Sequence, residues 1–254
     1  MTNIVKLKKM STVLKNKYNK NIILNEILKG RDKDVYLATV SEQEKFIVLN
    51  EKKNTKMRNY RTLQSNYFQK ELQKKGINVA DVIDIFEEKT LGVIAIHKYL
   101  EGTQTDTFDT QKAILCGKIV AQIHNANIKI KYNMCDFSYK YAICAFIKGL
   151  RDFSRFYKTV ICDKTGNKLP RGTCHRDLNL GNFIFINEDV YLIDFDRHSV
   201  CPFVYELRRF LDSEQNRYFT KDFMTGYLSM RNLNTDEQAY LLMMFPELKV
   251  LFNT

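Results

Sequence analysis

From Asn21 to about residue 100, most hydrophobic positions recur in short runs rather than at helical spacing. Each run is rich in β-branched or aromatic residues and is bounded by polar, turn-forming clusters, a pattern typical of β-strands. Between the third and fourth runs, residues 57–75 combine apolar residues at helical spacing with strong helix formers, and Gly76 ends the pattern. The sequence therefore predicts one helix and five strands, at residues 22–28, 35–40, 45–49, 79–86 and 92–96.

The hydrophobic period changes in the second part of the chain. Residues 110–125 carry Leu115, Ile119 and Ile123 four residues apart, which places these side chains on one face of a helix. Residues 203–211 show similar spacing, and the remainder of the chain predicts two or three further amphipathic helices. The fold class is therefore α+β, with an N-terminal antiparallel sheet and a mainly helical C-terminal part.

We predict three parts along the chain: an N-terminal arm at residues 1–20, a first lobe at residues 21–101 and a second lobe at residues 102–254. The arm has six lysines and no acidic residue. Its apolar residues stand at near-helical spacing, so it predicts either a basic amphipathic helix at a membrane surface, a helix packed on the first lobe, or a solvated arm. These apolar residues are Ile4, Leu7, Met10 and Leu14.

The strongest chemical signal is the sequence His-Arg-Asp-Leu-Asn-Leu-Gly-Asn at residues 175–182, followed by Asp194 at the end of an apolar run. Phosphoryl transfer from a nucleotide needs a carboxylate that steers the acceptor hydroxyl and Mg²⁺ that bridges the phosphate oxygens. Asp177 suits the first role. Mg²⁺ prefers hard oxygen ligands and keeps several waters, so Asn182 and Asp194 are the candidate metal ligands.

This pair of segments resembles the protein-kinase superfamily, in which an Asp-bearing loop with Asn five residues on precedes a metal-binding Asp. Asp196 stands where protein kinases carry glycine, which is more similar to the small-molecule branch of aminoglycoside phosphotransferases and choline kinases. Within this branch, residues 172–211 look most like the bacterial 3-deoxy-manno-octulosonic acid (Kdo) and lipopolysaccharide-core kinases. The resemblance implies a two-lobed protein-kinase-like fold, with Asp177 as the catalytic residue and with ATP and Mg²⁺ as cofactors.

The resemblance also implies a nucleotide site in the first lobe. Residues 98–102 stand at the hinge, where the family's backbone grips adenine, so Lys98 and Leu100 are candidate nucleotide contacts, together with Asn182 and Asp194. The family's third strand carries a lysine for the phosphates, and this chain has Asn50 there. Lys52, two residues later, is the candidate replacement.

Charge is distributed unevenly along the chain. The net charge is +11, with +8 in residues 1–60 and +7 in residues 128–171, so the remainder is mildly acidic. No nucleic-acid-binding motif accompanies the basic regions, and we predict no nucleic-acid partner. Residues 128–171 interleave aromatic and basic side chains, which suit a sugar ring and its anionic groups. A pair of core-packed helices with solvated lysines would give the same pattern.

Other features limit where the protein acts. The longest apolar run, at residues 141–147, is far shorter than the roughly 20 residues that a membrane-spanning helix needs. Six cysteines without a Cys-x-x-Cys pair indicate reduced, buried thiols. We predict a cytoplasmic protein, with peripheral contact to an anionic membrane surface as an open alternative, and no obligate protein partner.

The sequence favours an ATP-dependent kinase for a hydroxyl of a sugar-type acceptor, either a small molecule or a glycolipid, with an anionic sugar such as Kdo first. An aminoglycoside- or choline-type phosphotransferase is the alternative among enzymes. It would need an acidic acceptor lining, which only Glu206, Asp212 and Glu214 offer. A non-catalytic kinase-like binding protein is the third possibility, suggested by Asn50.

Overall fold

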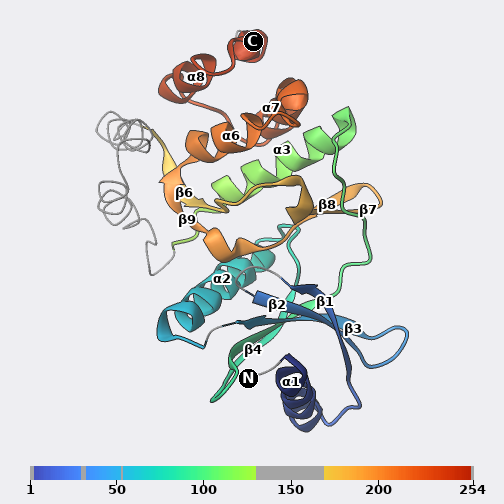
Figure 1. Cartoon of the computed structure of the whole chain (residues 1–254). Coiled ribbons are helices and arrows are strands. Elements are labelled where there is room, and N and C mark those ends of the chain that lie inside the picture. Colours follow the sequence, from blue (N-terminus) through green and yellow to red (C-terminus); the bar gives the residue numbers. More distant parts are fainter. Residues whose placement is uncertain (1–2, 30–32, 53, 130–168, 253–254) are drawn as a thin grey trace. The chain divides into compact units, whose positions relative to one another are not determined.

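Five β-branched and aromatic segments of the N-terminal part pair into one antiparallel sheet with the order β1-β2-β3-β5-β4 (Figure 1). The computed structural model describes residues 3–29, 33–52, 54–129 and 169–252, so most of the basic aromatic segment at 128–171 lies outside the described residues. The strands run over Ile23–Lys29 (β1), Lys33–Thr39 (β2), Lys45–Glu51 (β3), Val82–Glu88 (β4) and Gly92–Lys98 (β5).

The two faces of this sheet are covered differently. Helix α1 (Asn3–Tyr18) places Met10 and Leu14 against Tyr36 and Val48, and all four side chains are buried in one hydrophobic core. Helix α2 (Lys56–Lys74) lies against β4 and β5, where Asn66 contacts His97 over 2.6 Å. Because successive side chains of a strand point to opposite faces, α1 and α2 cover opposite faces of the sheet. The predicted arm is therefore a helix that completes the N-terminal core.

Two helices cross closely in the C-terminal part. Helix α3 (Thr110–Asn125) begins at Asp109, whose side chain accepts the Lys112 N–H, and it packs along α7 (Thr220–Leu228). A glycine from each helix stands at the crossing: a Cβ on Gly117 would lie 2.0 Å from the main-chain oxygen of Phe223, and a Cβ on Gly226 would lie 2.0 Å from that of Ile114. The approach of these two helices requires glycine at both positions.

Four short strands carry the segments between these helices. Strand β6 (Arg171–Cys174) pairs with β9 (Ser199–Pro202), and β7 (Phe183–Ile186) pairs with β8 (Asp189–Leu192), both antiparallel. Thr103 exchanges two main-chain hydrogen bonds with Phe185, at 3.0 and 2.9 Å. The kinase-like loop at residues 175–182 is thus held between two strands, β6 before it and β7 after it.

The remaining helices are α6 (Phe203–Leu211), α8 (Thr235–Leu242) and α9 (Lys249–Phe252), with 3-10 turns at Leu180–Asn182, Phe195–Arg197, Arg217–Phe219 and Pro246–Leu248. The chain divides into two compact units, Met1–Gly102 and Thr103–Thr254. The predicted fold class, an antiparallel five-stranded sheet followed by a mainly helical part, is confirmed.

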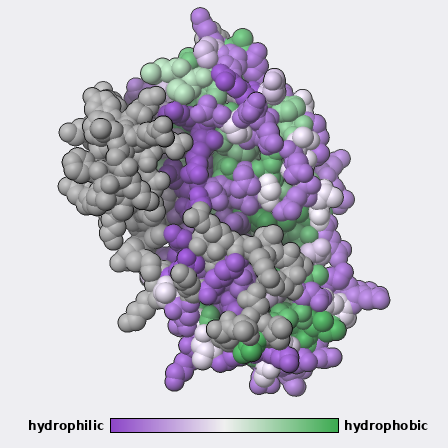
Figure 2. All heavy atoms as spheres, in the orientation of Figure 1, coloured by the Kyte–Doolittle hydropathy of each residue, from purple (hydrophilic) through white to green (hydrophobic). Residues whose placement is uncertain are grey.

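The described residues present a mostly polar surface on the face shown in Figure 2. Hydrophilic residues form most of the coloured surface in the view of Figure 2. Among the described residues, no helix combines the length and the apolar character that crossing a membrane would require.

Candidate active site

The loop between β6 and β7 holds Asp177 by its main chain. Arg176 adopts a left-handed backbone, with φ of 69°, which is uncommon for a residue other than glycine. The Asp177 N–H donates to Nδ1 of the buried His175 over 3.2 Å, and its main-chain oxygen accepts hydrogen bonds from the amides of Asn179 and Asn182. The backbone is fixed on both sides of the carboxylate, which is partly exposed and accessible to a substrate.

Asn182 is oriented so that its amide oxygen is left for another ligand. Its Nδ2 donates to the Asp177 oxygen over 2.9 Å, and this donor fixes which end of the amide carries oxygen. Within the described part of the chain, no protein donor contacts its Oδ1. An amide oxygen without a protein donor, in a residue that is 9% exposed, suits a hard divalent cation.

Asp194 follows β8 in a left-handed conformation, with φ of 63° and ψ of 64°, and its side chain is exposed. The preceding residue ties it to the loop: Ile193 donates its N–H to the Asn182 oxygen over 3.0 Å, and its own oxygen contacts Nε2 of His175 at 2.8 Å. Such strained backbone persists where surrounding contacts determine it, often at functional sites. The structure therefore brings Asp177 and Asn182 together and links the segment of Asp194 to both.

Two arginines approach the Asp177 carboxylate. One guanidinium nitrogen of Arg197 lies 3.5 Å from Oδ1, and one of Arg209 lies 4.0 Å from the same oxygen. Arg209 also donates to the main-chain oxygen of Arg176 over 3.3 Å. Both arginines are about half exposed, so these ion pairs are solvent-screened. They nevertheless place two cations beside the carboxylate.

A buried hydrogen-bond network supports the same loop. Glu206 on α6 is 3% exposed and accepts the main-chain N–H groups of His175, at 3.2 Å, and Arg176. His124 on α3 bridges it to Tyr227 on α7, with 2.9 Å from Nε2 to Glu206 and 2.8 Å from Nδ1 to the Tyr227 hydroxyl. Three helices thus converge on the turn that contains the left-handed Arg176.

The protonation of this network follows from burial and hydrogen bonding. Burial lowers the pKa of His124 despite its hydrogen bond to Glu206. Burial alone would raise the pKa of Glu206, but the hydrogen bond from His124 and the donor N–H of Arg176 hold it below its ordinary value. Burial raises the pKa of Tyr227. A neutral His124 therefore donates from Nε2 to the Glu206 carboxylate and accepts the Tyr227 O–H at Nδ1.

His124, Cys174 and Glu206 also form a group whose potential metal-ligand atoms lie within 4.8 Å of one another. Both ring nitrogens of His124 and both oxygens of Glu206 are already engaged in hydrogen bonds. Burial raises the pKa of the Cys174 thiol well above its ordinary value, which disfavours the thiolate that a metal would bind. We interpret the group as structural.

The predicted nucleotide contacts of the N-terminal unit occupy different environments. Lys52 is exposed just after β3, and its Nζ lies 3.7 Å from Asp34. Lys98 donates its main-chain N–H to Asp81 over 2.8 Å and extends an exposed side chain. The Leu100 oxygen accepts the Gly102 N–H over 3.0 Å. Their roles in nucleotide binding stay predictions.

The sequence matches the APH phosphotransferase enzyme family over residues 23–240. The chain belongs to this family. It is a small-molecule kinase that acts on a hydroxyl group, which confirms the enzyme class predicted from the catalytic loop. Comparison with curated proteins finds no match.

Solved structures of other kinases share the fold of this phosphotransferase at low sequence identity. Amicoumacin kinase hAmiN, solved with AMP-PNP, Ca²⁺ and Ami, has a TM-score of 0.64 at 15% identity, covering 99% of this chain and 97% of its own. Spectinomycin phosphotransferase APH(9)-Ia has a TM-score of 0.63 at 16% identity, covering 95% and 94%. A choline/ethanolamine kinase family protein from Mesorhizobium loti has a TM-score of 0.64 at 16% identity, covering 87% and 74%.

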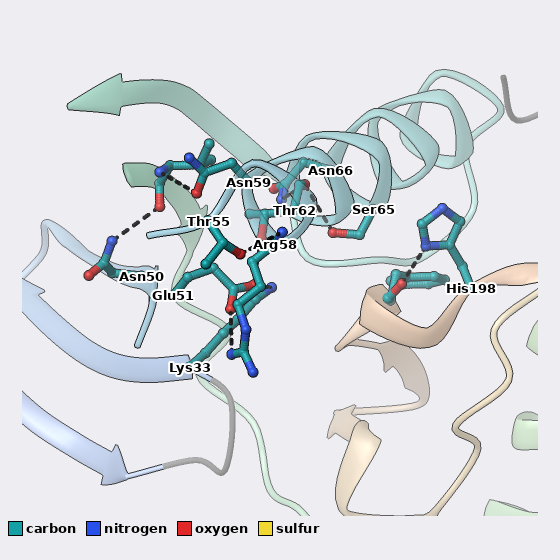
Figure 3. Close-up of polar contacts among 12 residues, drawn as sticks. Lys33, Asn50, Glu51, Thr55, Arg58, Asn59, Thr62, Ser65, Asn66 and His198 are labelled. Atoms are coloured by element: carbon teal, nitrogen blue, oxygen red, sulfur yellow. Dashed lines mark hydrogen bonds and ion pairs between the residues drawn. The ribbon is translucent and has the colours of Figure 1, made fainter. Parts of the chain in front are cut away.

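Sequence reasoning missed two features of this phosphotransferase. Glu206 was considered for an acidic acceptor lining, but its carboxylate is buried and holds the loop. The acidic side chain of Glu51, at the end of β3, was not considered at all. Figure 3 shows Lys33 and Arg58 reaching it from two different elements, with Asn50 directed elsewhere. Strand alternation was the signal available for Glu51, because Asn50 and Glu51 must face opposite sides of the sheet.

Proposed function

We propose that this phosphotransferase transfers the γ-phosphoryl group of ATP, with Mg²⁺, to a hydroxyl of an anionic sugar-type acceptor such as Kdo or a lipopolysaccharide-core sugar. The observation that carries the acceptor class is the position of Arg197 and Arg209, 3.5 and 4.0 Å from the Asp177 carboxylate. Cations beside the catalytic group favour an acceptor with a carboxylate or phosphate. A glycolipid that presents the same sugar falls within this proposal.

Asp177 is the catalytic residue in this proposal. Its carboxylate accepts the proton of the acceptor hydroxyl as that oxygen forms a bond to the γ-phosphorus, while the bond from phosphorus to the β-phosphate oxygen breaks and ADP leaves. Asn182 and Asp194 are the residues that would hold Mg²⁺, which neutralises charge on the phosphates when bound. Asn182 supports this role through the Oδ1 that its hydrogen bond to Asp177 leaves available.

The alternative acceptors are cationic: an aminoglycoside or choline. The spectinomycin and choline/ethanolamine kinase structures share the fold, and their names motivate this alternative. A cationic acceptor needs an acidic lining. Of the three acids that the sequence offers for it, Glu206 is buried and hydrogen-bonded to the loop and to His124, so only the exposed Asp212 and Glu214 remain. This disfavours the alternative.

The apolar face of α1 does not support a membrane contact. Met10 and Leu14 are fully buried against the sheet. Three of the helix's lysines, Lys6, Lys9 and Lys17, pair with acidic residues of the sheet strands. We therefore leave membrane binding by this helix out of the proposed function.

The test measures ADP release with ATP and Mg²⁺ across Kdo-containing acceptors, aminoglycosides and choline. We expect turnover with the anionic sugars, and loss of about 10²–10⁴-fold in kcat for Asp177→Asn, because a general base contributes that much. Glu188→Gln is the matched control, an exposed acid-to-amide change in the turn between β7 and β8. Turnover only with aminoglycosides or choline would reject the acceptor class.

The non-catalytic possibility has its own test. ATP with Mg²⁺ at a hundred times its dissociation constant should stabilise the protein by about 2.7 kcal/mol, a readily measured thermal shift. Absence of both this shift and any ADP release would reject the proposed function.

Arg197→Gln should raise KM for the anionic acceptor, because Arg197 lies beside Asp177. Arg217→Gln, at an exposed arginine of the same unit, should not raise KM.

A further inference from the structure

Alternation along β3 decides which of its side chains can reach a ligand on each face. Asn50 is fully buried and donates to the main-chain oxygens of Leu91 and Val93, at 2.9 and 3.2 Å. Its antiparallel partner Asp34 pairs with Lys6 of α1 over 2.7 Å, so this is the face that α1 covers. Asn50, where the family resemblance expected a lysine, is therefore directed into the α1 side of the sheet.

Glu51 takes the opposite face. It is 3% exposed, and its carboxylate accepts the Thr62 hydroxyl of α2 over 2.7 Å. Arg58 of α2 donates to it over 3.4 Å, and Nζ of Lys33 lies 3.9 Å away (Figure 3). Lys33 is the residue directly opposite Glu51 in the β2–β3 register. A buried carboxylate is stable only with such partners.

These contacts reverse the ion pair that a kinase ordinarily places here. The usual arrangement has a lysine on the third strand and a glutamate on the following helix. In this chain the acid is on the third strand, and the cations come from the helix and from β2. Lys33 is itself a buried cation, with 9% exposure.

The local charge favours an anion. Among the described residues, ion pairs on the Glu51 face join two cations, Lys33 and Arg58, to one carboxylate, whereas Lys6 and Lys52 pair with Asp34 on the other face. Arg58 also stands in the first turn of α2, whose 19 residues begin at a Thr55 cap. Main-chain N–H groups and the helix dipole at such a terminus add to the attraction for phosphate.

We propose that Lys33 and Arg58, held together by Glu51, contact the nucleotide phosphates in place of the missing third-strand lysine. Glu51 is a positioning residue, and Lys52, on the Asp34 side of the strand, is not the replacement. This assignment rests on the proposed function, because it takes ATP as the bound nucleotide. It explains how the chain can bind a triphosphate with Asn50 at the expected lysine position.

The test compares the affinities of ATP and adenosine, because only ATP carries the phosphates. Lys33→Met and Arg58→Gln should each weaken ATP binding at least tenfold, about 1.4 kcal/mol, and leave adenosine binding within about twofold. Lys52→Met should leave both affinities unchanged. Lys89→Met is the matched control, an exposed lysine in the β4–β5 turn of the same unit.

Removing Lys33 alone leaves Glu51 with one cation fewer and can destabilise the unit. The double variant Lys33→Met/Glu51→Gln removes both charges, and it should show the same selective loss of ATP affinity. Unchanged ATP affinity in the Lys33 and Arg58 variants, or a loss in Lys52→Met instead, would overturn the assignment while the proposed function stands. A wild-type protein that binds no ATP would overturn the proposed function and this assignment together.

Discussion

The side-chain amide of Asn182 donates a hydrogen bond to the main-chain oxygen of Asp177 over 2.9 Å. Asn182 thus contacts the proposed catalytic residue through its amide nitrogen, and its amide oxygen is left for the metal. Asn182→Ala should raise the Mg²⁺ concentration for half-maximal activity at least about tenfold, because a metal site that loses a supporting group typically weakens by 10–100-fold. Titrating Mg²⁺ at fixed ATP measures this.

The control for that prediction is Asn179. Its amide donates to the same Asp177 oxygen over 3.0 Å, but it is exposed and is not proposed as a ligand. Asn179→Ala should leave the Mg²⁺ dependence unchanged. An equal shift in both variants would mean that Asn182 acts only by supporting the loop.

Asp194 combines a left-handed backbone with the carboxylate proposed as a metal ligand, and the two contributions can be separated. Asparagine and aspartate tolerate this conformation better than β-branched residues. We expect Asp194→Asn to keep stability within about 0.5 kcal/mol while losing most activity, and Asp194→Val to cost about 1–2 kcal/mol as well. Urea unfolding and ADP release measure the two effects.

Asn187 offers a matched control for the backbone effect. It is also left-handed, with φ of 53°, and lies exposed in the turn between β7 and β8. Asn187→Val should lose similar stability and keep its activity. Full activity of Asp194→Asn would show that the negative charge of the Asp194 carboxylate is not needed.

The arrangement of the candidate catalytic loop was predictable from the sequence because its groups are contiguous. Residues 175–182 connect two strands that are consecutive along the chain, and Asp194 follows the next hairpin, so spacing alone brings them near one another. The helix at 110–125 was equally accessible, because its buried stripe repeats within one element. Short-range patterns determine short-range structure.

The supports of the site depend on long-range contacts that no spacing reveals. His124 meets Glu206 and Tyr227 across 82 and 103 residues of sequence. The side of the sheet to which Asn50 points depends on the packing of α1 on one face and of α2 on the other. Periodicity gives the alternation of Asn50 and Glu51, but it does not say which of the two faces the α2 side.

The crossing of α3 and α7 gives a prediction of stability. A Cβ at Gly117 would lie 2.0 Å from a main-chain oxygen of α7, and backbone cannot rotate away as a side chain can. Gly117→Ala should therefore cost about 3 kcal/mol or more, at or beyond the upper end of overpacking effects, and lower Tm by roughly 6 °C or more. Lys118→Ala, at the exposed neighbouring position, should change Tm little. Equal melting temperatures would contradict the close crossing.

The network beneath the loop predicts how stability changes with pH. Buried His124 lies beside the carboxylate of Glu206, the hydroxyl of Tyr227 and the thiol of Cys174. The ion pair between Arg231 and Glu237 lies further away and also acts on its pKa. Its pKa is lowered in the folded state, so between about pH 6.5 and that lower value the unfolded chain binds a proton that the folded chain does not. Stability therefore falls as pH drops below about 6.5, by up to about 1.4 kcal/mol per pH unit.

Glu206 adds a second loss at lower pH. Its folded pKa is also lowered, so its contribution is present above its ordinary pKa of about 4.5 and is lost as pH falls through the folded value. Urea unfolding at pH 7.5, 6.0 and 5.0 separates the histidine effect from this one. His124→Gln should be less stable at pH 7.5 and show a shallower slope. Tyr227→Phe, which removes a hydrogen bond but keeps the imidazole, should keep the wild-type slope. Equal slopes in wild type and His124→Gln would show that His124 titrates alike in both states.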